Sequence, residues 1–103
     1  MHKFKVQFDT DDGEFMVYEE HVYHNMNLIK PSKKGIFQFG NVSITFGRNA
    51  ASFTFTNGKT VLKFYDDGWV EYKGTRVREN GKGLVLGGNT TFIYIPMSSH
   101  LAA

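Results

Sequence analysis

Hydrophobic and polar residues alternate along most of the chain, the pattern of strands whose successive side chains point to opposite faces of a sheet. In the first run, Lys3 to Phe8, the apolar residues Phe4, Val6 and Phe8 share one face. Similar short runs of apolar, aromatic and β-branched residues recur at 15–18, 36–39, 42–46, 52–56, 59–65 and 90–95. The pattern predicts about nine or ten short strands, at the spacing expected of a sandwich or a barrel.

Turn-forming residues separate these runs and set the registers of the hairpins. The turns are expected at 10–13, 40–41, 57–58, 66–68 and 80–81, each of which contains glycine. A register is preferred where it pairs apolar residues across the two strands. The registers that result pair Phe8 with Phe15, Phe39 with Val42, Phe53 with Leu62, Phe64 with Val70, and Val77 with Leu84.

The fold class expected from this pattern is all-β, a small antiparallel β-barrel or β-sandwich built largely of consecutive hairpins in a meander. Residues 19–29 fit neither period cleanly. They form either a short helix, with Val22, Met26 and Ile29 on one face, or a continued strand. Residues 1–96 are expected to be a single domain, and 97–103 a flexible C-terminal tail.

Composition narrows the chemistry that the chain can perform. Its 103 residues suit one domain, and its formal net charge of +2 favours no class of partner. Without cysteine, the chain can form no disulfide, thiolate nucleophile or cysteine-ligated zinc site. The lack of disulfides favours a reducing compartment, so a cytoplasmic location is expected, and the sequence lacks an apolar run long enough for a membrane helix.

Residues that resemble metal sites or catalytic sites have simpler explanations. His21 and His24 are three residues apart and would point to opposite faces of a strand. The acidic segment 9–14 lacks the glycine that an EF-hand calcium loop has at its sixth position, and it suits a hairpin turn. No nucleophile elbow or phosphate loop is present. A metal, a cofactor and enzymatic activity are therefore not expected.

One surface carries the residue types that anchor binding partners. The expected register makes Tyr65 and Trp69 cross-strand neighbours that point away from the core. Tyrosine, tryptophan and arginine dominate the energetics of protein interfaces. The alternative is structural: the two rings lie in a second core layer or stabilise their hairpin. The binding residues expected on this surface are Lys63, Tyr65, Trp69, Lys73, Arg76 and Arg78.

These observations favour a non-enzymatic protein that docks on another macromolecule, above all a protein, for example as a small inhibitor or accessory factor. An alternative function is binding of RNA or single-stranded DNA, because the same residues can stack bases and neutralise phosphates. A third is a self-associating structural protein that forms a homo-oligomer through its edge strands. A membrane is not an expected partner.

Overall fold

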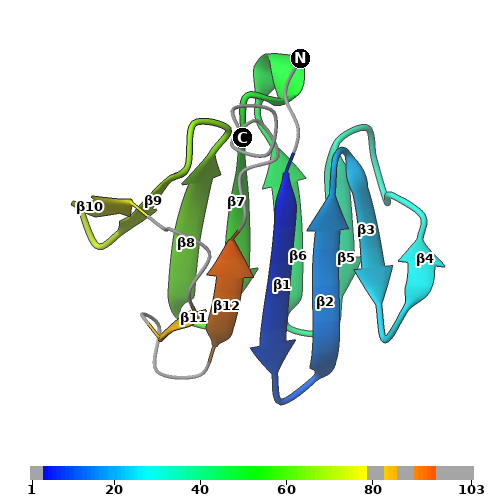
Figure 1. Ribbon diagram of the computed structural model, residues 1–103. Coiled ribbons are helices and arrows are strands. Elements are labelled where there is room, and N and C mark those ends of the chain that lie inside the picture. Colours follow the sequence, from blue (N-terminus) through cyan, green and yellow to red (C-terminus); the bar gives the residue numbers. More distant parts are fainter. Residues whose placement is uncertain (1–3, 79–82, 86–89, 95–103) are drawn as a thin grey trace, which may run out of the picture.

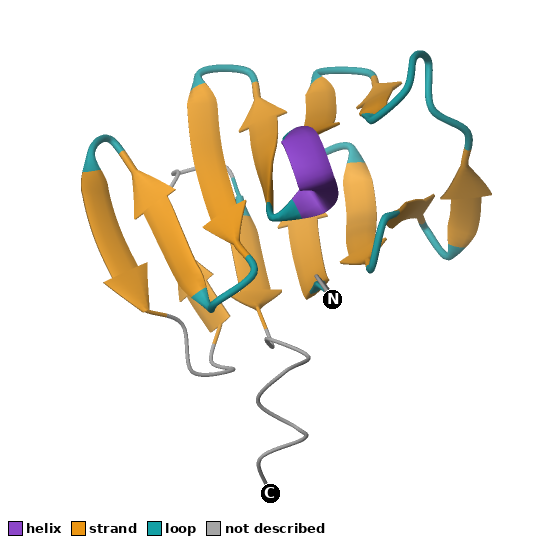
Figure 2. Ribbon diagram, turned by 90° about the horizontal axis from the view of Figure 1, so that it is seen from above, coloured by secondary structure: helices purple, strands orange, loops and turns teal. Residues whose placement is uncertain are grey.

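Two six-stranded antiparallel sheets face each other in the computed structural model, which describes residues 4–78, 83–85 and 90–94 (Figures 1 and 2). The first sheet has the strand order β11-β12-β1-β2-β3-β4, and the second has the order β10-β9-β8-β7-β6-β5. The strands of the first sheet are β1 (Lys5–Thr10), β2 (Gly13–Tyr18), β3 (His21–His24), β4 (Asn27–Ile29), β11 (Gly83–Val85) and β12 (Thr91–Tyr94). Those of the second are β5 (Ile36–Phe39), β6 (Val42–Phe46), β7 (Ser52–Asn57), β8 (Thr60–Tyr65), β9 (Trp69–Tyr72) and β10 (Thr75–Arg78). A short 3-10 helix, η1 (Arg48–Ala50), joins β6 to β7.

The all-β prediction is confirmed, in the form of a sandwich. The chain makes one meander from β1 to β4, crosses to the second sheet for β5 to β10, and returns for β11 and β12. Within the described ranges no strand of one sheet pairs with a strand of the other, so the barrel is not closed. The same residues contain no helix of the length and apolar character needed to cross a membrane.

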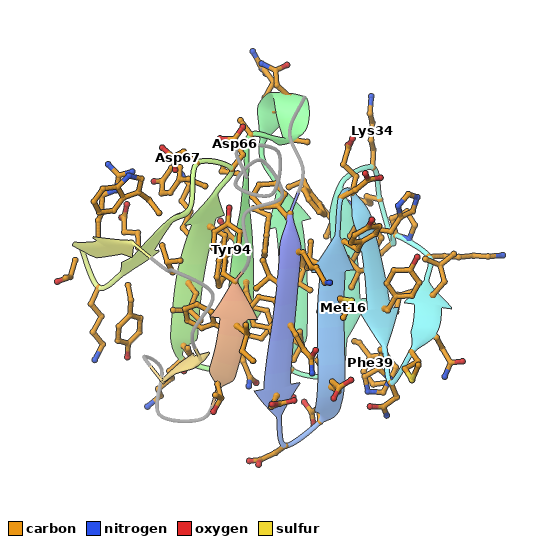
Figure 3. All side chains as sticks on the ribbon, viewed as in Figure 1. Met16, Lys34, Phe39, Asp66, Asp67 and Tyr94 are labelled. Carbon is orange, nitrogen blue, oxygen red and sulfur yellow. The ribbon has the colours of Figure 1, made fainter. Side chains whose placement is uncertain are left out.

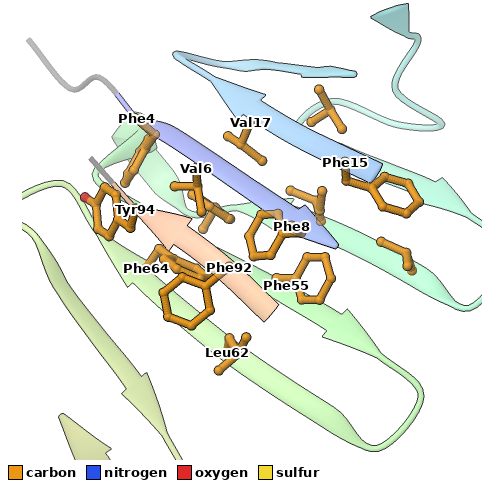
Figure 4. Close-up of a cluster of buried hydrophobic side chains, with 14 of the residues drawn as sticks. Phe4, Val6, Phe8, Phe15, Val17, Phe55, Leu62, Phe64, Phe92 and Tyr94 are labelled. Atoms are coloured by element: carbon orange, nitrogen blue, oxygen red, sulfur yellow. The ribbon is translucent and has the colours of Figure 1, made fainter. Parts of the chain in front are cut away.

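Stacked phenylalanine rings join the two sheets (Figure 4). Phe8 of β1 stacks on Phe55 of β7 with 4.0 Å between ring centroids, and it meets Phe64 of β8 edge to face at 5.2 Å. Phe53 and Phe64 stack within the second sheet at 4.8 Å. All four rings are fully buried. Because neighbouring positions on each strand alternate between core and surface, the side chains between the buried ones lie on the outward faces of the two sheets.

Residues 19–29 form two strands, so the helix alternative is wrong for this segment. Val22 is buried opposite Val17, as a strand of the first sheet requires. Asn25 and Met26 both have positive φ, 47° and 70°, and make the tight turn between β3 and β4. The sequence did not indicate this turn clearly, because methionine is an uncommon residue at positive φ. The alternation of the two short strands was therefore not recognised.

The hairpin turn predicted at Asn57-Gly58 lies one residue further along the chain, which changes the pairing of the two strands. The turn consists of Gly58 and Lys59, Asn57 pairs with Thr60, and Phe53 therefore pairs with Phe64 instead of Leu62. The buried Asn57 side chain donates a hydrogen bond from Nδ2 to Oγ1 of Thr90 at 3.1 Å. This contact with the opposite sheet holds Asn57 in the strand and moves the turn outward.

The pairing of Val77 with Leu84 is also wrong, because the strands that contain them belong to different sheets. Val77 pairs with Val70, across a turn in which Lys73 and Gly74 both have positive φ, and Leu84 pairs with Phe92. The Asn80-Gly81 turn and the tail at 97–103 lie outside the described residues.

Three other predicted registers, Phe8 with Phe15, Phe39 with Val42, and Phe64 with Val70, are confirmed. Phe39, expected in the core, is 42% exposed. It lies at the end of the edge strand β5, where its ring stacks on His24 with 3.9 Å between centroids.

A test of the fold uses the glycine of the β1–β2 hairpin. Gly13 has a φ of +118°, and a Cβ atom there would lie 2.7 Å from Nε2 of His24. That ring cannot easily move, because it stacks on Phe39 and its Nε2 lies 2.8 Å from the carbonyl oxygen of Asp12. We expect Gly13→Ala to lower the free energy of unfolding by about 2 to 4 kcal/mol in urea denaturation.

Gly58→Ala is the matched control, because its φ is also positive but a Cβ atom there would meet nothing within 4 Å. It should cost only about 1 kcal/mol, the conformational term alone. Equal losses in the two variants would contradict the packing described around Gly13.

Candidate functional site

The outward side of β8, β9 and β10 gathers aromatic and charged side chains into one cluster. On β8, Leu62 and Phe64 are buried in the core, whereas Lys63 and Tyr65 are half-buried on the opposite side. Lys63 pairs with Glu71, and Glu71 pairs with Arg76, so three adjacent strands contribute one row of side chains. We call this surface the aromatic–cationic face; its described members are Lys63, Tyr65, Trp69, Glu71 and Arg76.

Arg76 organises the aromatic–cationic face. Its guanidinium carbon lies 4.8 Å from the ring centroid of Tyr65 and 5.4 Å from that of Trp69, within the range of cation–π attraction. The ammonium of Lys63 lies 5.3 Å from the Tyr65 ring. The Tyr65 hydroxyl donates a hydrogen bond to Oε1 of Glu71 at 3.1 Å. These contacts order side chains that would otherwise be mobile on a surface.

The structure brings together most of the residues predicted for this site. Tyr65 and Trp69 lie half-exposed on the outward face of their sheet, away from the core side that Phe64 and Val70 occupy. Lys73 is exposed, with its ammonium 5.3 Å from the Tyr72 ring. Arg78 pairs with Trp69 through the backbone, and its side chain lies outside the described part of the molecule. The contacts also stabilise the hairpins, as the structural alternative requires.

A groove of about 400 Å³ extends the face toward the β7–β8 turn. Its lining residues come from three strands and the ends of their turns: Thr54, Lys59, Val61, Lys63, Glu71, Tyr72 and Lys73. Lys59 lies in the turn before β8 and was not among the predicted site residues, although alternation from Lys63 through Val61 indicates the same side of the sheet. Val61, 49% exposed, adds apolar surface beside these lysines.

Acidic residues border the other end of the aromatic–cationic face. Asp66 and Asp67 form the turn after β8 (Figure 3). Oδ1 of Asp67 accepts a hydrogen bond from the backbone N–H of Trp69 at 3.2 Å, which fixes the entry of the chain into β9. The face thus has cations along its centre and groove, and carboxylates at one end.

Tyr94 of the opposite sheet holds this turn from inside the sandwich. Its hydroxyl donates a hydrogen bond to the carbonyl oxygen of Tyr65, which also accepts the N–H of Gly68 at 3.2 Å. Burial of the phenol raises the pKa of Tyr94; a backbone contact with Gly68 opposes this shift, and the charges of Asp66 and Asp67 add to it. Tyr94 is therefore a positioning residue for Tyr65, a role that sequence alternation could not reveal.

The lysines before β5 and the two histidines of β3 do not join this site. Lys33 and Lys34 precede β5, at the edge of the second sheet opposite to β10. Lys34 and Arg48 instead line a separate groove of about 680 Å³ beside η1. His24 lies on the core side of β3, next to Phe15, while His21 is exposed. Among the described residues no group of three or more histidines and carboxylates is placed to hold a metal ion.

We expect Tyr94→Phe to lower the free energy of unfolding by about 1 to 2 kcal/mol, because the Tyr65 carbonyl loses a buried donor. The wild-type protein should also lose stability as the pH rises above about 10, where an exposed tyrosine ionises in the unfolded state while the buried phenol stays neutral. For one such group the slope approaches about 1.4 kcal/mol per pH unit.

Urea denaturation measured between neutral and alkaline pH checks both effects. In Tyr94→Phe, the free energy of unfolding should fall less steeply as the pH rises. In Tyr18→Phe, which changes an exposed tyrosine, it should fall as in the wild type. An unchanged slope in Tyr94→Phe would refute the assignment.

Comparisons of the chain with protein-family models, with curated proteins and with solved structures find no match. The geometry of the described residues is therefore the basis for any functional assignment.

Proposed function

We propose that this protein is a non-enzymatic binding protein that docks on another protein through the aromatic–cationic face. The observation that carries the proposal is the position of Arg76 over both Tyr65 and Trp69 on an outward sheet face. Tryptophan, tyrosine and arginine are the residues most enriched among energetic hot spots. Held in place by mutual contacts, they lose less conformational entropy when a partner binds.

The charge of the face defines the partner surface that fits it. Lys59, Lys63, Lys73 and Arg76 surround one carboxylate, Glu71, whose Oε1 already accepts the Tyr65 hydroxyl. An acidic protein surface with an apolar centre complements this arrangement. The carboxylates of Asp66 and Asp67 would repel a phosphate backbone that runs on past the cationic part of the face. The acidic patch of a protein can be confined to that part, which favours a protein over a nucleic acid.

A test replaces one residue of the face at a time and compares the affinity of each variant for the partner with that of a control variant at another exposed arginine. Trp69→Ala and Arg76→Ala should each weaken the complex at least about thirtyfold, the loss expected for a hot spot of about 2 kcal/mol. Arg48→Ala removes the same charge from an exposed arginine at the start of η1 and should bind like the wild type. Thermal melts show that each variant is folded.

The probe is the protein retained by immobilised wild-type chain from a lysate of the source organism, then purified and titrated by calorimetry. Wild-type affinity in both Trp69→Ala and Arg76→Ala would contradict the assignment of the face. If Arg48→Ala weakens binding as much as Arg76→Ala does, the partner responds only to the net charge of the protein.

Binding of RNA or single-stranded DNA is the second candidate, supported by the cation–π contacts of the Arg76 guanidinium with two aromatic rings. Salt separates the two functions. Phosphate contacts make the logarithm of the affinity fall linearly and steeply with the logarithm of salt concentration. Fluorescence anisotropy with mixed-sequence oligonucleotides that shows binding at low salt, with this dependence, would favour the nucleic acid.

A further inference from the structure

The outward face of the first sheet carries an apolar stripe that the proposed function does not use. Cross-strand pairs align Leu28, Tyr23, Met16, Gln7 and Ile93 in one row across β4, β3, β2, β1 and β12. Gln7 is the polar member of this row. Leu28 is 59% exposed and Ile93 39% exposed. Leu28, Tyr23 and Met16 form a continuous apolar surface, and Gln7 separates it from Ile93. Exposed apolar surface of this kind marks interaction sites on soluble proteins.

A groove of about 510 Å³ lies along this stripe. Met16 and Tyr23 line its floor, and Met26, which is 88% exposed, extends it beside the β3–β4 turn. Figure 3 shows Met16 on β2, in the sheet nearer the viewer. Methionine side chains adapt to irregular partner surfaces, so this stripe is suited to being covered.

Charges of opposite sign lie on the two sides of the apolar row. Lys5, opposite Tyr18, lies two pairs from the row in one direction along the strands. Asp9 and Glu14, opposite each other, lie two pairs from it in the other direction. All three charged side chains are exposed. Lys5 and Asp9 are equally far from Gln7, two residues away along β1 in each direction.

We propose that a second copy of this chain covers this face, related to the first by a two-fold axis that lies along the apolar row. Rotation about this axis reverses every strand, so Lys5 of one copy faces Asp9 and Glu14 of the other, and the contact occurs twice. Met16 meets its own counterpart at the centre. Strand directions in packed sheets stay within about 30° of each other, which keeps the charged ends within reach.

The area of the face sets the strength of this dimer. The five strands are spaced about 4.8 Å apart and are three to six residues long, so the face covers about 24 Å by 10 to 20 Å before side-chain relief is counted. Stable interfaces bury about 800 Å² on each partner, so this face is smaller than a standard stable interface. We therefore expect a weak dimer that forms at high micromolar concentrations and above. This inference does not rest on the proposed function, which uses the other sheet.

Sedimentation equilibrium of the full chain tests the dimer and its centre. The wild type should show a concentration-dependent dimer, and Met16→Lys should be monomeric. Val61→Lys introduces the same charge at an exposed apolar residue of the opposite sheet and should keep the dimer. Circular dichroism and thermal melts establish that the variants are folded. A wild-type monomer at millimolar concentration, or a dimer that Met16→Lys does not weaken, would overturn the proposal.

Charge reversal tests the symmetry. Lys5→Glu and Asp9→Lys each place like charges opposite one another twice, and each should weaken its homodimer about tenfold. A mixture of the two variants restores opposite charges at both contacts, so the heterodimer should recover the wild-type affinity, measured by native mass spectrometry with one isotope-labelled variant. A mixture that dimerises no better than its components would refute the two-fold arrangement.

Discussion

Ring packing across the interior is the interaction on which the rest of this molecule depends. The two sheets are not continuous with each other through strand pairing anywhere in the described ranges, so side chains must hold them together. Phe8 provides the clearest case, because its ring stacks on Phe55 and meets Phe53 and Phe64 edge to face. Each such aromatic pair contributes about 0.5 to 1.5 kcal/mol beyond the burial of its area. The proposed binding surfaces are the two outward faces, because phenylalanine rings make up most of the inner layer of the described residues.

Polar contacts between the sheets then determine how the outward faces are shaped. Asn57 reaches Thr90 near one end of the sandwich, and Tyr94 reaches the Tyr65 carbonyl near the other. The first contact sets the register of β7 against β8, and thereby which residues line the groove beside Lys63. The second fixes the turn that carries the chain from Tyr65 to Trp69. The geometry of the aromatic–cationic face is thus decided partly by residues in the opposite sheet.

Local patterns in the sequence predicted what depends on local physics. Alternation and loop length placed Tyr65 beside Trp69 and Lys63 beside Glu71, because the register of a three-residue hairpin is set by its own turn. The failures have non-local or atypical causes. The turn after Asn57 moved because of a hydrogen bond to Thr90, 33 residues away. Methionine at 26 and lysine at 73 occupy positive-φ positions that usually hold asparagine or glycine, so only Asn25 and Gly74 marked these two turns in the sequence.

A sandwich of this kind offers two outward surfaces that differ in chemistry and point in opposite directions. The face of β8 to β10 presents ordered aromatic rings among cations, whereas the face of β1 to β4 presents an apolar stripe between opposite charges. Two copies joined through their first sheets would carry their aromatic–cationic faces on the outside, facing away from each other. Such a dimer would engage two sites on an oligomeric or repetitive partner, and the second contact would form at a raised effective concentration. Self-association through one sheet would therefore increase the binding strength available through the other, without any direct contact between the two surfaces.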